Sequence, residues 1–77
     1  MADELLVWIA RRLVDEPDAV RVETEEREDA TVLRLHVAPD DVGKVIGRQG
    51  RIARALRTVV RASAARSRRR VLLEIVD

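Results

Sequence analysis

The chain has 77 residues, 47% of them apolar, with a net charge of +1, one aromatic side chain and no cysteine. This length is near the lower limit for folding on a single hydrophobic core, so we expect one domain spanning residues 1–77, without disulfide bonds or thiolate metal sites. No apolar run approaches the roughly 18 residues of a membrane span and the N-terminus is acidic, which predicts a soluble, cytoplasmic protein that does not contact membranes.

Hydrophobic periodicity predicts six elements along the chain. They are a helix over residues 4–14, strands over 20–25 and 31–37, a short helix ending near 46, a long helix from about 50, and a strand over 71–76. Asp3 is expected to cap the first helix, and Pro39–Asp41 to end the second strand and cap the short helix. This order predicts an α+β fold, a two-layer α-β-β-α-α-β sandwich with a three-stranded sheet packed on three helices.

The long helix has two different faces. The predicted core face carries Ile52, Leu56, Val59, Val60 and Ser63. The opposite face carries Arg51, Arg54, Arg57 and Arg61. These arginines belong to the basic part of the chain, since residues 42–77 contain ten basic side chains against two carboxylates, whereas residues 1–41 contain five arginines against twelve carboxylates. An anionic ligand is therefore expected to bind the second part.

Between the short and the long helix, the stretch VIGRQGRI places Gly47 and Gly50 three positions apart. Glycine adopts positive φ and lets another backbone approach closely. The amide groups that begin the long helix lack partners within it, and with the helix dipole they favour a phosphate. Basic residues surround this point, among them Lys44 and Arg48. The turn therefore suits a sugar-phosphate backbone.

The segment DVGKVIGRQGRIA, residues 41–53, resembles the Ile-Gly-x-x-Gly core of KH domains, and the predicted element order is that of the type II, or prokaryotic, form. The chain length, the run Arg57–Ala62 and the ending Glu74–Asp77 resemble the small bacterial single-KH proteins of the KhpA type. The resemblance covers nearly the whole chain.

The resemblance implies binding of single-stranded RNA, in which the GxxG turn clamps about four nucleotides. Carried over by position, Gly47, Arg48, Gln49 and Gly50 would hold the RNA backbone. Lys44, Arg51 and Arg54 would add phosphate contacts, and Val45 would line the groove. The resemblance also implies an RNA chaperone or post-transcriptional regulator that acts with a KhpB-like (Jag-like) KH protein and influences cell-wall homeostasis and cell length. Separately, the small core suggests self-association as a further source of stability, so a homodimer is a candidate assembly.

Other interpretations compete with this one. The chain could be a module for dimerisation or docking whose partner supplies most of the RNA binding, because it is small, lacks aromatic residues for base stacking and is acidic in its first part. Its only aromatic residue, Trp8, is expected in the core or at an interface. A DNA-binding helix-turn-helix fits the flanking strands poorly. No metal site, cofactor motif or nucleophile–base pair is visible, so we do not expect an enzyme. The arginines within residues 66–70 are expected in a solvated loop.

Overall fold

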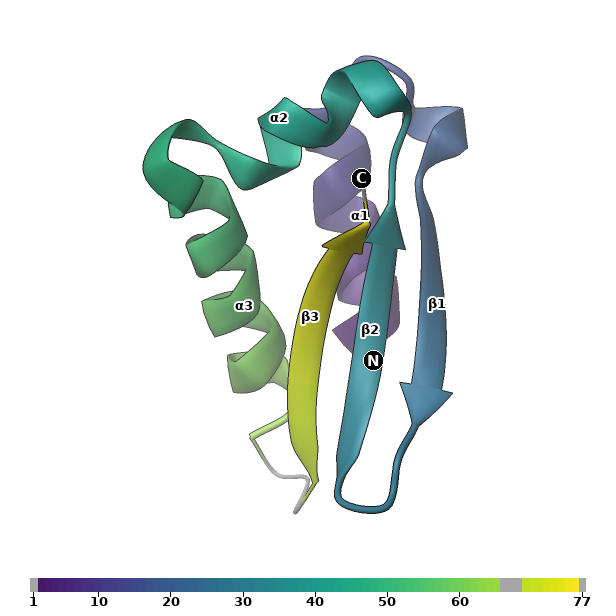
Figure 1. Cartoon of the computed structure of the whole chain (residues 1–77), viewed down its shortest axis with the longest axis vertical. Helices are drawn as coiled ribbons and strands as arrows, with labels where there is room; N and C mark the ends of the chain where they lie inside the picture. Colours follow the sequence, from purple (N-terminus) through teal and green to yellow (C-terminus); the bar gives the residue numbers. More distant parts are fainter. Residues whose placement is uncertain (1, 66–68, 77) are drawn as a thin grey trace.

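A computed structural model describes residues 2–65 and 69–76, and the predicted elements occur there in the predicted order (Figure 1). The helices are α1 (Ala2–Leu13), α2 (Val42–Ile46) and α3 (Arg51–Ser63). The strands are β1 (Arg21–Glu26), β2 (Ala30–His36) and β3 (Arg70–Val76). Short 3-10 turns occur at Pro17–Ala19, Pro39–Asp41 and Arg48–Gly50. The α+β fold class is confirmed, and no helix in these two ranges is long and apolar enough to cross a membrane.

The three strands form one mixed sheet with β2 at its centre. β1 pairs antiparallel and β3 parallel with β2, so that Leu35 of β2 lies between Val22 of β1 and Ile75 of β3. A parallel pair requires a long crossover connection, and α2 and α3 provide it between β2 and β3. The turn between these two helices therefore lies at the end of the molecule toward which β2 and β3 run (Figure 1).

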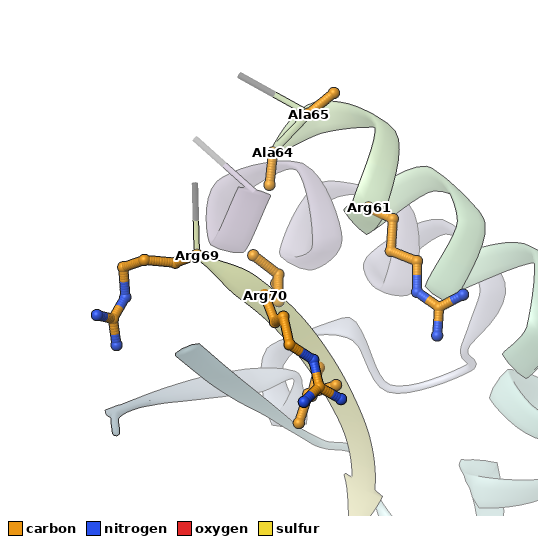
Figure 2. Close-up of a pocket in the computed structure, with 7 residues that line it drawn as sticks. Arg61, Ala64, Ala65, Arg69 and Arg70 are labelled. Atoms are coloured by element: carbon orange, nitrogen blue, oxygen red, sulfur yellow. The ribbon is translucent and has the colours of Figure 1, made fainter. Parts of the chain in front are cut away.

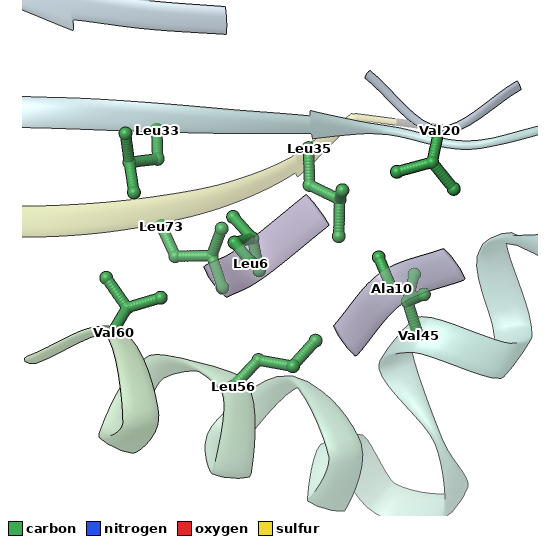
Figure 3. Close-up of a cluster of buried hydrophobic side chains, with 9 residues drawn as sticks. All are labelled: Leu6, Ala10, Val20, Leu33, Leu35, Val45, Leu56, Val60 and Leu73. Atoms are coloured by element: carbon green, nitrogen blue, oxygen red, sulfur yellow. The ribbon is translucent and has the colours of Figure 1, made fainter. Parts of the chain in front are cut away.

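The helices pack on one face of the sheet, and the core lies between the two layers (Figure 3). Its buried residues are Leu6, Ala10, Val20, Leu33, Leu35, Val45, Leu56, Val60 and Leu73. Full burial of one leucine or valine side chain stabilises a fold by about 1.5 to 3 kcal/mol. Since every helix contributes to this cluster, the core fixes the positions of α2 and α3, and with them the turn that joins these helices.

Two details of the helices correct the sequence predictions. α1 begins at Ala2, so Asp3 lies within its first turn, where a carboxylate favours the helix dipole, instead of capping it. In α3 the buried residues are Ala53, Leu56 and Val60, whereas Val59 and Ser63 are exposed. The prediction favoured large apolar side chains, but the small Ala53 occupies a buried position. The arginine face of α3 is exposed, as predicted.

The face of the sheet that points away from the helices carries ion pairs between strands. Arg34 Nη1 lies 2.6 Å from Glu25 Oε1, and Arg34 Nε lies 3.7 Å from Glu74 Oε2. One guanidinium therefore links all three strands. Hydrogen bonds from Arg27 and from Arg34 lower the pKa of Glu25, and the hydrogen bond to Glu25 raises the pKa of Arg34.

The turn between β1 and β2 is closed by Arg69, which precedes β3. The Arg69 guanidinium donates to the carbonyl oxygen of Ala30 at 2.8 Å and to that of Arg27. We expected residues 66–70 to form a solvated loop. This is wrong for Arg69, whose guanidinium group donates hydrogen bonds to carbonyl oxygens of the hairpin. Residues 66–68 lie outside the described part of the chain.

The single aromatic side chain lies on the surface of α1. Trp8 is 55% exposed, and the guanidinium carbon of Arg12 lies 3.8 Å from the centroid of its ring. Such a cation–π contact contributes about 0.5 to 1 kcal/mol at an exposed site. Trp8 is therefore not a core residue, which was one of its two expected locations.

Candidate nucleic-acid interface

The glycine turn, residues 47–50, joins α2 to α3 through an unusual backbone. The φ angle is +76° at Gly47, +57° at Gln49 and +74° at Gly50. Residues with a Cβ atom rarely adopt positive φ, and Gln49 is the one described non-glycine residue that does. Its side chain is exposed. The chain thus changes direction between α2 and α3 within four residues, with glycine backbone at both ends of the turn.

The two glycines are required for different reasons. A Cβ atom on Gly47 would lie 2.4 Å from Cγ1 and 2.9 Å from the backbone nitrogen of Ile52, so α3 packs directly on this glycine. Its φ and ψ, +76° and 173°, also lie in a region that only glycine adopts readily. Gly50 has left-handed φ and ψ, and a Cβ atom there would have nothing within 4 Å. Gly47 serves packing, whereas Gly50 leaves open space beside the turn.

Three exposed arginines surround the glycine turn. Arg51 Nη2 lies 3.4 Å from Gln49 Oε1, and Arg54 Nη2 lies 3.5 Å from the Gln49 carbonyl oxygen. These contacts are long and involve neutral acceptors, so both guanidinium groups keep their charge uncompensated. The Arg48 side chain has no hydrogen bond or ion pair to the residues that the structure describes. A guanidinium can bind a phosphate through two parallel hydrogen bonds.

The start of α3 adds backbone donors to these side chains. Gly50 is the N-cap residue, and no side chain of the described residues caps this helix. The first amide groups of a helix lack partners within it, and the helix dipole gives this end a partial positive charge. Exposed arginines and the positive end of the helix dipole therefore lie at the same turn, which is an arrangement suited to an anion.

Lys44 has a different environment from these arginines. Its Nζ lies 3.1 Å from Asp15 Oδ2 and 3.3 Å from Asp41 Oδ1. The hydrogen bonds with Asp15 and then with Asp41 raise the pKa of Lys44. The ammonium group thus ties α2 to the segment that follows α1. Its charge is already compensated by two carboxylates.

Asp41 is the one buried charged side chain among the described residues, with 1% exposure. Its Oδ2 accepts a hydrogen bond of 3.0 Å from the backbone nitrogen of Glu16. Burial alone would raise the pKa of Asp41, but hydrogen bonds from the backbone of Glu16 and Asp15 and from Lys44 outweigh it, so the pKa lies below its ordinary value. We expected Asp41 to cap α2. It occupies the N-cap position, but its carboxylate binds the Asp15–Glu16 segment instead.

Val45 was expected along the groove, and it lies inside the core with 0% exposure. Its side chain therefore has no surface to offer a ligand, and it anchors α2 from within. On the exposed side of the same helix is Gly43, where an added Cβ atom would have nothing within 4 Å. The surface of α2 is consequently open at Gly43, a position that the sequence analysis did not single out.

The structure brings together four of the eight predicted site residues as exposed groups around one turn. These four are Arg48, Gln49, Arg51 and Arg54, with the backbone of Gly47 and Gly50 between them. Sequence reasoning missed the aspartate pair at Lys44. The spacing of Asp41 and Lys44, three residues apart next to a helix, indicates one of these contacts. No local signal indicates Asp15, which is 29 positions away.

Comparison with known proteins identifies relatives over the whole chain. The family model described as KhpA/KhpB, KH domain, matches residues 3–75. A Treponema pallidum protein named RNA-binding protein KhpA is 54% identical over 77 residues, which cover 100% of this chain and 96% of the relative. Proteins of the same name from Aquifex aeolicus and Bacillus subtilis are 52% and 48% identical, over 96% and 97% of this chain and 94% and 93% of the relatives.

No solved structure matches the chain. The matched family model nevertheless includes the glycine turn and, apart from Ala2 and Val76, all residues of the described helices and strands. Each of these three relatives matches 96% or more of the chain. The chain therefore belongs to the KhpA/KhpB family of KH domains.

Proposed function

We propose that the chain acts as one KH domain that binds single-stranded RNA by gripping its sugar-phosphate backbone. The observation that carries this proposal is the glycine turn, whose positive-φ backbone is flanked by the uncompensated guanidinium groups of Arg48, Arg51 and Arg54. The printed names of the relatives, RNA-binding protein KhpA, support it. They also support a binding protein rather than an enzyme, acting in the cytoplasm where cellular RNA is found.

In this proposal the predicted site residues have different roles. Gly47, Gln49 and Gly50 give the turn its shape, and Arg48, Arg51 and Arg54 bind phosphates. Lys44 holds α2 in place through Asp15 and Asp41, and it adds long-range charge rather than a direct contact. Val45 supports the site from the core.

Binding of this kind is weak and loose in sequence. Phosphate contacts carry no base information and weaken as salt concentration rises. The one aromatic ring, Trp8, lies on α1, so base stacking worth about 1 to 3 kcal/mol per base is absent at the turn. Such binding suits an RNA chaperone or post-transcriptional regulator. On the strength of the family resemblance, we extend the proposal to a KhpB-like partner and a role in cell-wall homeostasis and cell length.

The test is fluorescence anisotropy of labelled single-stranded RNA with Gly50→Asp and Gly50→Asn. Both side chains fit, because Gly50 has open space and both residue types tolerate left-handed φ. They have the same shape, but only aspartate places a negative charge at the clamp. We expect Gly50→Asp to weaken binding by about tenfold or more and Gly50→Asn to weaken it much less.

Circular dichroism must show that both variants fold, and titrations at two salt concentrations must show weaker binding of the wild type at higher salt. Equal RNA affinity of the two variants would contradict the proposed phosphate clamp. Wild-type protein that binds no RNA by itself would favour the second candidate function.

The second candidate is a dimerisation or docking module, favoured by apolar side chains exposed on the helices. Trp8 of α1 is 55% exposed and Val59 of α3 is 36% exposed, and these two helices pack together. Exposed tryptophan is typical of protein interfaces. Sedimentation of the wild type and of Trp8→Glu with Val59→Glu tests this candidate. A protein that stays monomeric, alone and with a KhpB-like partner, contradicts it.

A further inference from the structure

A recess lies at the opposite end of α3 from the glycine turn. It has a volume of about 330 Å³ and lies between the last turn of α3 and the first half of β3 (Figure 2). Its described lining consists of Arg61, Ala64, Ala65, Arg69, Arg70, Val71 and Leu72. The described lining therefore combines four apolar side chains with three arginines and contains no carboxylate.

The three arginines of the recess differ in their partners. Arg69 is bound to carbonyl groups of the hairpin, and its side chain points away from Arg70 (Figure 2). Arg61 and Arg70 are exposed, and their side chains form no hydrogen bond or ion pair with the described residues. Two uncompensated guanidinium groups beside an apolar recess suit a ligand that has both an anionic group and a flat apolar surface.

A line of positive charge connects this recess to the glycine turn. Arg54, Arg57 and Arg61 lie within about 60° of each other around α3, and all three are exposed. From Gly50 to Arg61 the helix advances by about 16 Å. A nucleic-acid strand that begins at the glycine turn therefore meets further arginines along α3 before it reaches the recess.

We propose that the recess takes one nucleotide of a single-stranded RNA that is longer than the segment held by the glycine turn. Arg61 and Arg70 bind its phosphate, and its base lies on Val71, Leu72 and Ala64, or on the plane of a guanidinium group, which takes the role of the missing aromatic ring. The volume is at the lower end of that of small-ligand pockets, enough for one nucleotide. This inference rests on the proposed RNA binding at the glycine turn.

The test compares oligoribonucleotides of about four and about ten nucleotides by anisotropy. The variant is Arg61→Gln with Arg70→Gln. The matched control is Arg11→Gln with Arg21→Gln, which removes the same charge from exposed arginines on α1 and β1. We expect the recess variant to bind the longer RNA about fivefold or more weakly than the control variant does, with a salt dependence reduced by about 1.4 in logarithmic slope. The shorter RNA should bind both variants alike.

Each other outcome has a definite meaning. If both variants bind the longer RNA equally while Gly50→Asp loses binding, the recess assignment is overturned and the glycine turn stands. If the wild type binds neither RNA, both proposals fail. Arg61→Lys with Arg70→Lys keeps the charge but removes the planar guanidinium groups. If this variant binds the longer RNA as tightly as the wild type does, stacking of the base on a guanidinium group is overturned. If uridine monophosphate displaces the longer RNA at equal nucleotide concentration, the recess binds a free nucleotide, and the proposal of a bound RNA strand is overturned.

Discussion

Four arginines in or beside the β1–β2 hairpin and the arginines of α3 have opposite surroundings, while Arg70 of β3 is unpaired within the described part of the chain, like those of α3. Arg21, Arg27, Arg34 and Arg69 each have a guanidinium nitrogen within 3.8 Å of a carboxylate oxygen. Among the described residues, no carboxylate lies within ion-pair distance of the α3 arginines Arg51, Arg54, Arg57 and Arg61. The chain has nearly equal numbers of basic and acidic side chains, so the imbalance on α3 results from their placement. Paired arginines serve the fold, and unpaired arginines are available to a ligand.

The largest expected effect comes from reversing charge on the unpaired side. Arg51→Glu with Arg54→Glu removes charged hydrogen bonds worth about 1.5 to 3 kcal/mol each, so RNA affinity should fall by well over tenfold. The free energy of unfolding should change little, because neither side chain has a carboxylate partner among the described residues. Anisotropy and urea unfolding measure the two quantities. A loss of stability without a loss of RNA affinity would mean that Arg51 and Arg54 serve the fold and not a ligand, which contradicts the comparison above.

The next effect distinguishes the structural roles of the two glycines of the turn. Gly47→Ala should lower the free energy of unfolding by about 3 kcal/mol, because the new methyl group would meet Ile52 and the backbone conformation suits only glycine. Gly50→Ala should cost about 1 to 2 kcal/mol, since it meets only the penalty of left-handed φ. Urea unfolding of both variants gives the comparison. Equal losses would mean that Ile52 moves aside at little cost.

Much of this architecture is predictable because its signals are local. The change from helical to alternating periodicity locates the strands, and the glycine pair with its basic neighbours locates the candidate site. The exposure of Val59 was missed because a helical wheel shows which residues share a face, but not where the centre of that face meets the sheet. The small Ala53 moves that centre away from Val59.

Contacts between distant parts of the chain were not predictable. Arg69 binds carbonyl groups roughly 40 positions earlier, and Lys44 binds Asp15 across 29 positions. Neither contact has a periodic or motif signal, because each depends on how the crossover and the hairpin come together in space. In both contacts a positively charged side chain that sequence reasoning treats as available to a ligand already binds another part of the chain. The sequence therefore overestimates the positive charge available at a site until the fold shows which charges are paired.

A smaller effect is expected on the paired side, at Arg69. Arg69→Gln should lower the free energy of unfolding by about 1 to 2 kcal/mol, because the hairpin carbonyl groups lose a partly exposed charged donor. RNA affinity should fall no more than for the control Arg11→Gln. Arg69→Lys is the sharper variant, since lysine keeps the charge but cannot reach several carbonyl groups at once. Full recovery of stability by lysine would mean that Arg69 acts through charge alone.

The smallest effect concerns the dependence of stability on pH at Asp41. Its pKa is lower in the folded protein than in the unfolded chain, so its contribution to stability is present above the unfolded value of about 3.9 and is lost as the pH falls through the folded value. Asp41→Asn should therefore flatten the acid limb of a plot of unfolding free energy against pH. Asp40→Asn, on the adjacent exposed residue, is the matched control for the loss of one carboxylate. RNA affinity at neutral pH should hardly change with Asp41→Asn, because α2 retains its core contact through Val45. A large loss of affinity in a folded Asp41→Asn variant would mean that the paired Lys44, and not only the unpaired arginines, sets the geometry of the glycine turn.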